Sequence, residues 1–150
     1  MKLAEALSLR ADLQQRFSQL KKRLKASTKI QEGDTPPENV EGLRREMDEI
    51  LEHLEDIIYR INFTNMNTVA GSGTLTELIA RKDILTMRVS ALREIADNMT
   101  EREDRFGRSE IRYVRTVDVS DFRKELDRYS KELRELDNTI QSLNWTVELQ

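Results

Sequence analysis

The stretch SDFRKELDRYSKELRELDNTIQSLNWTV, residues 120–147, decides the fold. Its apolar residues recur at alternating spacings of four and three, and they form one narrow seam of Phe122, Leu126, Tyr129, Leu133, Leu136, Ile140, Leu143 and Val147. A seam that persists for more than three heptads is typical of a helix that pairs with another helix as in a coiled coil. Ser120 is the expected N-cap of this helix, with Asp121 in the first turn.

Two earlier segments carry the same pattern. Residues 2–26 place Leu3, Ala6, Leu13, Phe17, Leu20 and Leu24 on one helix face. Arg10 interrupts this stripe, and it either packs its stem with its charge in solvent or fixes the register as a polar residue. The next helix is expected after Pro36-Pro37, because proline suits a first turn and prevents helix before it. Its stripe consists of Val40, Leu43, Met47, Ile50, Leu54, Ile57 and Ile61.

The remaining helical segment is apolar on two sides. It opens with Thr74-Leu75-Thr76-Glu77, a capping box that satisfies N–H groups at a helix start. One stripe consists of Leu78, Leu85, Val89, Leu92, Ala96 and Met99. A second stripe lies about 120° away at 3.6 residues per turn, and it consists of Ala80, Ile84, Met87, Ala91 and Ile95. A helix with two apolar sides is either central in its own bundle or part of a subunit interface, so the second stripe is the candidate oligomer interface.

Four segments of similar length with modest connections predict an all-α protein. We expect an antiparallel up-down-up-down four-helix bundle with long, coiled-coil-like helices, forming a single domain over residues 1–150. The connections at 27–35 and 103–119 then lie at one end, and the connection at 62–73 lies at the other end beside both termini. Residues 28–31 and 111–117 are β-branched and alternating, so we expect them to pair as a small β-ribbon.

Composition and charge exclude several classes of function. The chain has no cysteine, which excludes disulfides, thiolate nucleophiles and zinc–thiolate sites. Its net charge of −3 gives no global basic field to attract nucleic acid or an anionic membrane. Glu5 and Arg10 stand where a signal peptide needs an unbroken apolar core, and no segment has the roughly 18 apolar residues of a membrane span. We therefore expect a cytoplasmic protein without a membrane partner.

The sequence contains no catalytic or metal motif. His53 is the only histidine, and Ile50 stands where the Glu-x-x-His motif of a di-iron bundle requires glutamate. No nucleophile elbow accompanies this histidine. We expect His53 to be a solvated residue beside the helix stripe, and we assign no catalytic residue, metal ligand or cofactor.

The stretch from Ile61 to Thr76 has no charged residue in a chain that is 35% charged. Gly71-Ser72-Gly73 directly precedes a helix start, whose backbone N–H groups could hold phosphate or carboxylate, although the lysine of a P-loop is missing. The alternatives are a polar connection that caps the following helix and a site for a small anion or nucleotide. Trp145 at the same end is either a packing anchor or an exposed interface residue. The candidate residues are Asn62, Asn65, Asn67, Ser72, Thr74, Asn144 and Trp145.

Arginines gather in the last connection, with Phe106 and Tyr113 interleaved. The guanidinium fork suits phosphate and carboxylate, and aromatic rings can stack on bases. The alternatives are pairing with Asp and Glu of the same or a neighbouring subunit, contact with nucleic acid, and contact with an acidic protein partner. The candidate contacts are Arg105, Arg108, Arg112 and Arg115.

Several motifs are shared with a known group of proteins. They are MKLAEAL at residues 1–7, INFTN at 61–65, GTLT at 73–76, DRFGRSEI at 104–111 and QSLNW at 141–145. Over essentially its whole length the chain resembles a family of short, uncharacterised bacterial proteins often labelled "septicolysin", for which the resemblance implies no established activity. The label suggests a cytolysin, but a helical pore-former needs a long apolar segment, so we expect the label not to describe the activity.

Three hypotheses of function remain. We favour a non-enzymatic scaffold or interaction protein that assembles as a homo-oligomer, with a further protein partner as a candidate. A nucleic-acid-binding module through the 102–115 region is the first alternative, and it is not favoured because the local basic excess is small. A binder of a small anion or nucleotide at the 62–74 end is the second alternative.

Overall fold

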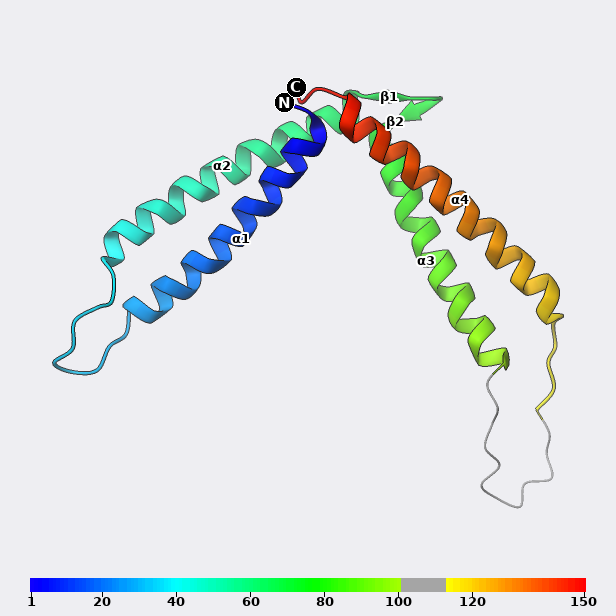
Figure 1. Cartoon of the computed structure of the whole chain (residues 1–150), viewed down its shortest axis with the longest axis horizontal. Coiled ribbons are helices and arrows are strands. Elements are labelled where there is room, and N and C mark those ends of the chain that lie inside the picture. The colour runs from blue at the N-terminus through cyan, green and yellow to red at the C-terminus, as the bar shows by residue number, and fades with distance from the viewer. Residues whose placement is uncertain (101–112) are drawn as a thin grey trace, which may run out of the picture. The chain divides into compact units, whose positions relative to one another are not determined.

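The structure is a computed structural model that describes residues 1–100 and 113–150. It is all-α with one two-stranded hairpin, which confirms the fold class expected from the sequence (Figure 1). The elements in chain order are α1 (Leu3–Ser27), α2 (Val40–Asn67), β1 (Val69–Ala70), β2 (Gly73–Thr74), α3 (Leu75–Thr100) and α4 (Val119–Thr146). None of these helices is long and apolar enough to cross a membrane, judged over the residues that the structure describes.

The chain divides into two compact units. The first comprises Met1–Thr76 together with Gln141–Gln150, and the second comprises Glu77–Ile140. The helical hairpin of α1 and α2 belongs to the first unit, and α3 and most of α4 form the hairpin of the second (Figure 1). The single domain expected over residues 1–150 stays a prediction.

The first unit is held by the stripes of α1 and α2. Leu20 and Ile57 are nearly inaccessible to solvent, and the buried residues of the two stripes are Leu3, Ala6, Leu13, Leu20 and Leu24 from α1 with Leu43, Ile50, Ile57 and Ile61 from α2. These positions follow the spacing of three and four that places them on one helix face. Asn39 caps α2 and accepts a hydrogen bond from the Gly42 amide at 3.1 Å, which ends the connection after the two prolines.

The second unit is a hairpin of α3 and α4. Lys82 pairs with Asp137 at 2.5 Å, and the Arg88 guanidinium lies 4.7 Å from the centre of the Tyr129 ring. Because the α4 partner number falls as the α3 number rises, the two helices are antiparallel, as expected. The N-cap of α4 differs from the expectation: Asp118, not Ser120, accepts a hydrogen bond from a first-turn amide, that of Asp121, at 3.0 Å.

The β-ribbon expected between residues 28–31 and 111–117 was wrongly placed. Residues 28–31 and 113–117 form no strand, and residues 111 and 112 lie outside the described residues. The strands form instead within 69–74, where Val69 pairs with Thr74 and Ala70 with Gly73. Gly71 has φ of +67° at the first turn position, as a type II′ hairpin turn requires. A local turn closes this hairpin, whereas the expected ribbon needed a long-range pairing that only alternation supported.

Candidate functional site

The second apolar stripe of α3 is exposed along its whole length. Ile84, Met87 and Ile95 are 58%, 68% and 48% exposed, and both alanines of the stripe, Ala80 and Ala91, are exposed as well. The first stripe of the same helix is the inner one, since its central residues Leu85, Val89 and Ala96 are buried. The prediction of a helix that is apolar on two sides is therefore confirmed, and one of the two sides faces solvent.

Contacts with α4 fix the rotation of α3 and so fix which stripe is exposed. Arg81 pairs with Glu132, and Lys82 pairs with Asp137, on the side of the helix that faces α4. Arg88 rests on the ring of Tyr129, where the aromatic face attracts the cation. The exposed stripe is thus presented on a helix whose orientation is set by a buried seam and by polar contacts beside it.

The polar end of the first unit is built differently from the expected loop. α2 continues to Asn67, so Asn62, Asn65 and Asn67 are helical residues rather than parts of a connection. Threonine and asparagine favour turns in isolation, but the neighbouring Ile61 is fully buried and holds the helix in place. The side-chain amide of Asn67 donates to the Phe63 carbonyl at 2.8 Å, so this side chain is hydrogen-bonded within its own helix.

The start of α3 provides little for an anion. α3 begins at Leu75, directly after Thr74, as the capping box predicts. The Leu75 amide donates to the Thr68 carbonyl at 2.9 Å, so the first N–H of the helix is already bonded to backbone. Ser72 stands in the hairpin turn, and Thr74 belongs to β2. This geometry favours the interpretation of the 62–73 region as a structural connection.

Two residues of α4 at this end differ in exposure. Asn144 is buried, whereas Trp145 is 64% exposed. Trp145 is therefore not a packing anchor, and the alternative of an exposed indole is the one that the structure supports. A tryptophan of this exposure adds a large apolar surface to an end that also exposes Phe63 and Met66.

Both chain ends meet the end of α2, and backbone hydrogen bonds join them. The Leu3 amide donates to the Val147 carbonyl, and the Leu149 amide donates to the Met1 carbonyl, each at 2.9 Å. The Gln150 amide donates to the Thr64 hydroxyl at 3.0 Å. These bonds confirm that the end of α2 lies beside both termini.

A charged contact reinforces these hydrogen bonds. The Lys2 ammonium lies 2.7 Å from a carboxylate oxygen of Glu148. The hydrogen bond from the Lys2 side chain, with a second from the Met1 amino group, lowers the pKa of Glu148 below its ordinary value. Partners so far apart in the sequence leave no periodic pattern or motif that could have revealed them.

The arginine-rich region is mostly outside the described residues. Arg105, Arg108 and Arg112 lie in the part of the chain that the structure does not describe. Arg115 is described, and its Nε donates to the Met99 carbonyl at 2.8 Å. Because the last carbonyls of a helix lack intrahelical partners, the Nε of Arg115 stabilises the end of α3, and this bond uses one of the donors of the guanidinium.

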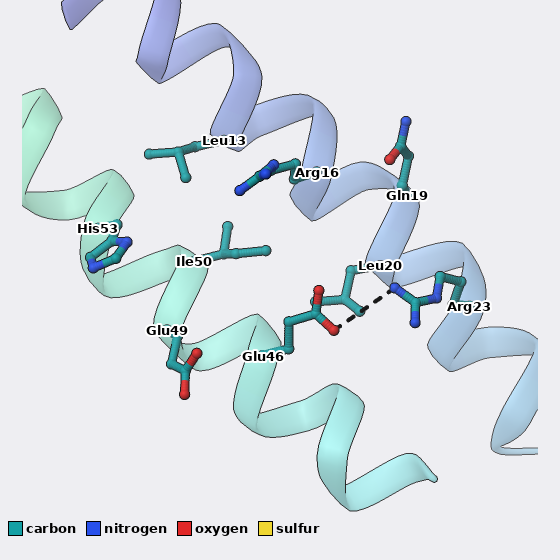
Figure 2. Close-up of a pocket in the computed structure, with 9 residues that line it drawn as sticks. All are labelled: Leu13, Arg16, Gln19, Leu20, Arg23, Glu46, Glu49, Ile50 and His53. Atoms are coloured by element: carbon teal, nitrogen blue, oxygen red, sulfur yellow. Dashed lines mark ion pairs between the residues drawn. The ribbon is translucent and has the colours of Figure 1, made fainter. Parts of the chain in front are cut away.

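A groove of about 390 Å³ lies between α1 and α2 and carries balanced charge (Figure 2). Arg16 and Arg23 line it from α1, and Glu46, Glu49 and His53 line it from α2. Arg23 lies 3.8 Å from Glu46, and its hydrogen bond to Glu38 raises the pKa of the guanidinium. Two arginines and two glutamates line the groove, so its lining carries no net charge that would attract an anion or a cation.

His53, which lines the groove, is exposed, as the sequence predicted. Within residues 1–100 and 113–150, no group of three or more His, Asp or Glu side chains could hold a metal ion.

Comparison with known proteins places the chain in a family. A family of unknown function (DUF6847) matches residues 10–149, which is nearly the whole sequence. The chain belongs to this family. A similar fold is seen in a crystal structure described as that of a functionally unknown conserved protein from Corynebacterium diphtheriae, with 42% identity and a TM-score of 0.92. That similarity covers 100% of this chain and 99% of the other, and no curated protein matches.

Membership in DUF6847 gives the chain relatives without giving it an activity. The function must therefore be argued from the surfaces that the residues form. The resemblance to the family labelled "septicolysin" stays a prediction.

Proposed function

We propose that this protein is a non-enzymatic scaffold or interaction protein that assembles as a homo-oligomer through the exposed stripe of α3. The observation that carries the proposal is the exposure of Ile84, Met87 and Ile95 on a helix that is already packed on its other side. A helix that exposes a continuous apolar stripe to water loses hydrophobic stabilisation that a partner surface would supply. The regular spacing of the stripe is that of a helix–helix contact.

The other features of the described residues support an interaction role. The groove between α1 and α2 is charge-balanced, and the arginine that borders the undescribed region, Arg115, is bonded to the end of α3. The N-terminus of α3 is bonded to backbone. These observations do not favour the nucleic-acid module or the anion site over the assembly. We further propose that the assembly is cytoplasmic and that its helices pair as in coiled coils.

The test is the mass of the double variant Ile84→Glu/Met87→Glu in solution. Two buried carboxylates in each subunit interface would cost far more than the apolar contacts supply, so we expect the oligomer to dissociate to the 17.6 kDa monomer. Multi-angle light scattering gives the mass, and circular dichroism shows that the helices persist.

A matched control separates the interface from general surface effects. Leu51→Glu/Ile58→Glu makes the same change in charge at two partly exposed apolar residues of α2. This control should keep the wild-type mass. An α3 double variant that also keeps the wild-type mass would show that the stripe is not the interface, and a monomeric wild-type protein would remove the proposed function.

A further inference from the structure

The hairpin of α1 and α2 has two sides, and the groove occupies one of them. At 100° per residue, the charged residues of the groove turn to one side of the buried stripes of both helices. Another set turns to the opposite side, which we call the back face. It comprises Arg10, Phe17 and Lys21 from α1, with Met47, Leu51, Leu54 and Ile58 from α2. The back face lies wholly within the first unit.

The apolar residues of the back face extend beyond the contact between α1 and α2. Leu51 and Ile58 lie beside the stripe of α2 that packs on α1, and they are 39% and 36% exposed. Phe17, Met47 and Leu54 belong to the paired stripes, but each remains partly exposed. A helix with so wide an apolar surface packs against more than one neighbour. The back face therefore has the form of a contact with a third helix.

The border of the back face on α1 is basic. From Leu13 to Gln31 the sequence contains no Asp or Glu. Lys21 and Lys25 are exposed on this border, and neither forms an ion pair with a described residue. The Lys21 ammonium lies 5.9 Å from the centre of the Phe17 ring, which holds it beside the apolar residues. A partner that covers this border therefore needs negative charge.

Arg10 places a further positive charge within the back face. Its Nε is buried and has no hydrogen-bond partner, and the guanidinium forms no ion pair within residues 1–100 and 113–150. A cation that is removed from water without a partner destabilises the fold. A carboxylate from a bound helix supplies the partner that the described residues do not provide.

We propose that the back face binds an amphipathic helix of another protein, with carboxylates along the flank that lies over α1. The apolar stripe of this helix covers Leu51 and Ile58, and its carboxylates face Arg10 and Lys21. The back face is a different surface from the exposed stripe of α3, so the inference goes beyond the proposed homo-oligomer and does not depend on it.

The border on α2 selects a helix over a polyanion. Asp48 and Glu55 lie beyond Leu51 on the outer side of α2. They repel a ligand that is anionic on all sides, such as nucleic acid, whereas a helix directs its acidic flank to α1 and a neutral flank to α2. A phosphate backbone also has no apolar surface to cover Leu51 and Ile58.

Binding is tested on the full chain with three labelled peptides of about 20 residues, which is enough for about five turns of helix. The acidic peptide carries a leucine stripe with glutamates along one flank. The basic peptide has lysines in place of the glutamates, and the polar peptide has serines in place of the leucines. Fluorescence anisotropy should show binding of the acidic peptide, and binding at least tenfold weaker for the other two. Equal binding of the basic or the polar peptide would overturn the inference.

Two double variants locate the binding surface. Leu51→Glu/Ile58→Glu should weaken binding of the acidic peptide more than tenfold, because it removes apolar surface and adds negative charge. Ile84→Glu/Met87→Glu, on the α3 stripe, should leave this binding unchanged. The mass measurements predict the reverse, so the failure of this inference is distinguishable from the failure of the proposed function. A lower mass for Leu51→Glu/Ile58→Glu would assign the back face to a second copy and overturn the inference.

A charge reversal tests the basic border. Lys21→Glu/Lys25→Glu should weaken binding of the acidic peptide about tenfold and strengthen binding of the basic peptide. Arg10→Gln should weaken binding of the acidic peptide about fivefold, and circular dichroism shows that the variants remain helical. A charge reversal that leaves the preference for the acidic peptide unchanged would overturn the inference. Displacement of the acidic peptide by a polyuridylate RNA would assign the face to a polyanion and would also overturn it.

Discussion

Thr64 offers the sharpest test of how the chain ends are held. Its side chain is fully buried, its hydroxyl donates to the Arg60 carbonyl at 2.8 Å, and the same oxygen accepts the Gln150 amide at 3.0 Å. Thr64→Val keeps the shape and leaves the Gln150 N–H without its acceptor. A lost hydrogen bond that strands a fully buried donor costs about 1–3 kcal/mol, and this bond is part-buried with an exposed Gln150, so we expect about 1.5 kcal/mol of destabilisation.

The matched control is Thr68→Val. The Thr68 hydroxyl donates to the Thr64 carbonyl at 2.7 Å, and that carbonyl also accepts the Thr68 amide at 2.9 Å, so its removal strands no donor or acceptor. We expect a loss of about 0.5–1 kcal/mol. Urea unfolding followed by the fluorescence of Trp145, the only tryptophan, reports on the first unit, which contains both threonines. Equal destabilisation by the two variants would refute the role assigned to the Thr64 oxygen.

Three further predictions concern single residues. Because the pKa of Glu148 is lowered in the folded protein, its contribution to stability is present above the ordinary value of 4.5 and is lost as the pH falls through the lower folded value. Glu148→Gln should therefore reduce the fall in the free energy of unfolding at acidic pH. An unchanged pH dependence would argue against the pairing with Lys2. The buried Nε of Arg10 has no hydrogen-bond partner among the described residues. Arg10→Leu should therefore raise the unfolding temperature, measured by calorimetry, by about 2–4 °C. A lower unfolding temperature would show that Arg10 makes a stabilising contact. Gly71→Ala, at φ of +67°, should cost about 1 kcal/mol in urea unfolding, and a neutral result would show that the turn is not strained by a side chain.

The helices were predictable because their signal is local and repeated. Leu13 and Leu20 of α1, with Ile50 and Ile57 of α2, are buried at the positions that the spacing of three and four indicated. The same reasoning found both faces of α3, since Leu85 and Ile84 differ by about 100° on a helix although they are neighbours in the sequence. Both stripes were therefore recognisable from the sequence alone, whereas the exposure of the second stripe was seen only in the structure.

The ends of the helices and their connections were less predictable. Asn62, Asn65 and Asn67 have weak helix propensity, yet α2 includes them because Ile61 and Thr64 are buried in the first unit. Gly71-Ser72 is typical of a two-residue hairpin turn, but the polar residues around it favoured the prediction of an irregular connection. The β-branched residues of 28–31 lie instead in a connection where Ile30 is exposed.

Contacts between distant residues were beyond sequence reasoning. Lys2 and Glu148 lie at opposite ends of the chain, and no motif relates them. Which stripe of α3 faces α4 was likewise seen only from the contacts of Arg81 with Glu132 and of Arg88 with Tyr129. The periodicity gives the two stripes, whereas the tertiary structure shows which of them faces solvent.

The measurement that tests the central claim most directly is the concentration dependence of methionine methyl signals in NMR. Met87 in the stripe and Met66 in α2 are almost equally exposed, at 68% and 66%, so each serves as the other's reference. If the stripe is the oligomer interface, the Met87 methyl signal should shift on dilution through the dissociation range while the Met66 signal stays constant. A Met87 signal that does not change while the mass of the protein falls would contradict the assembly proposed here.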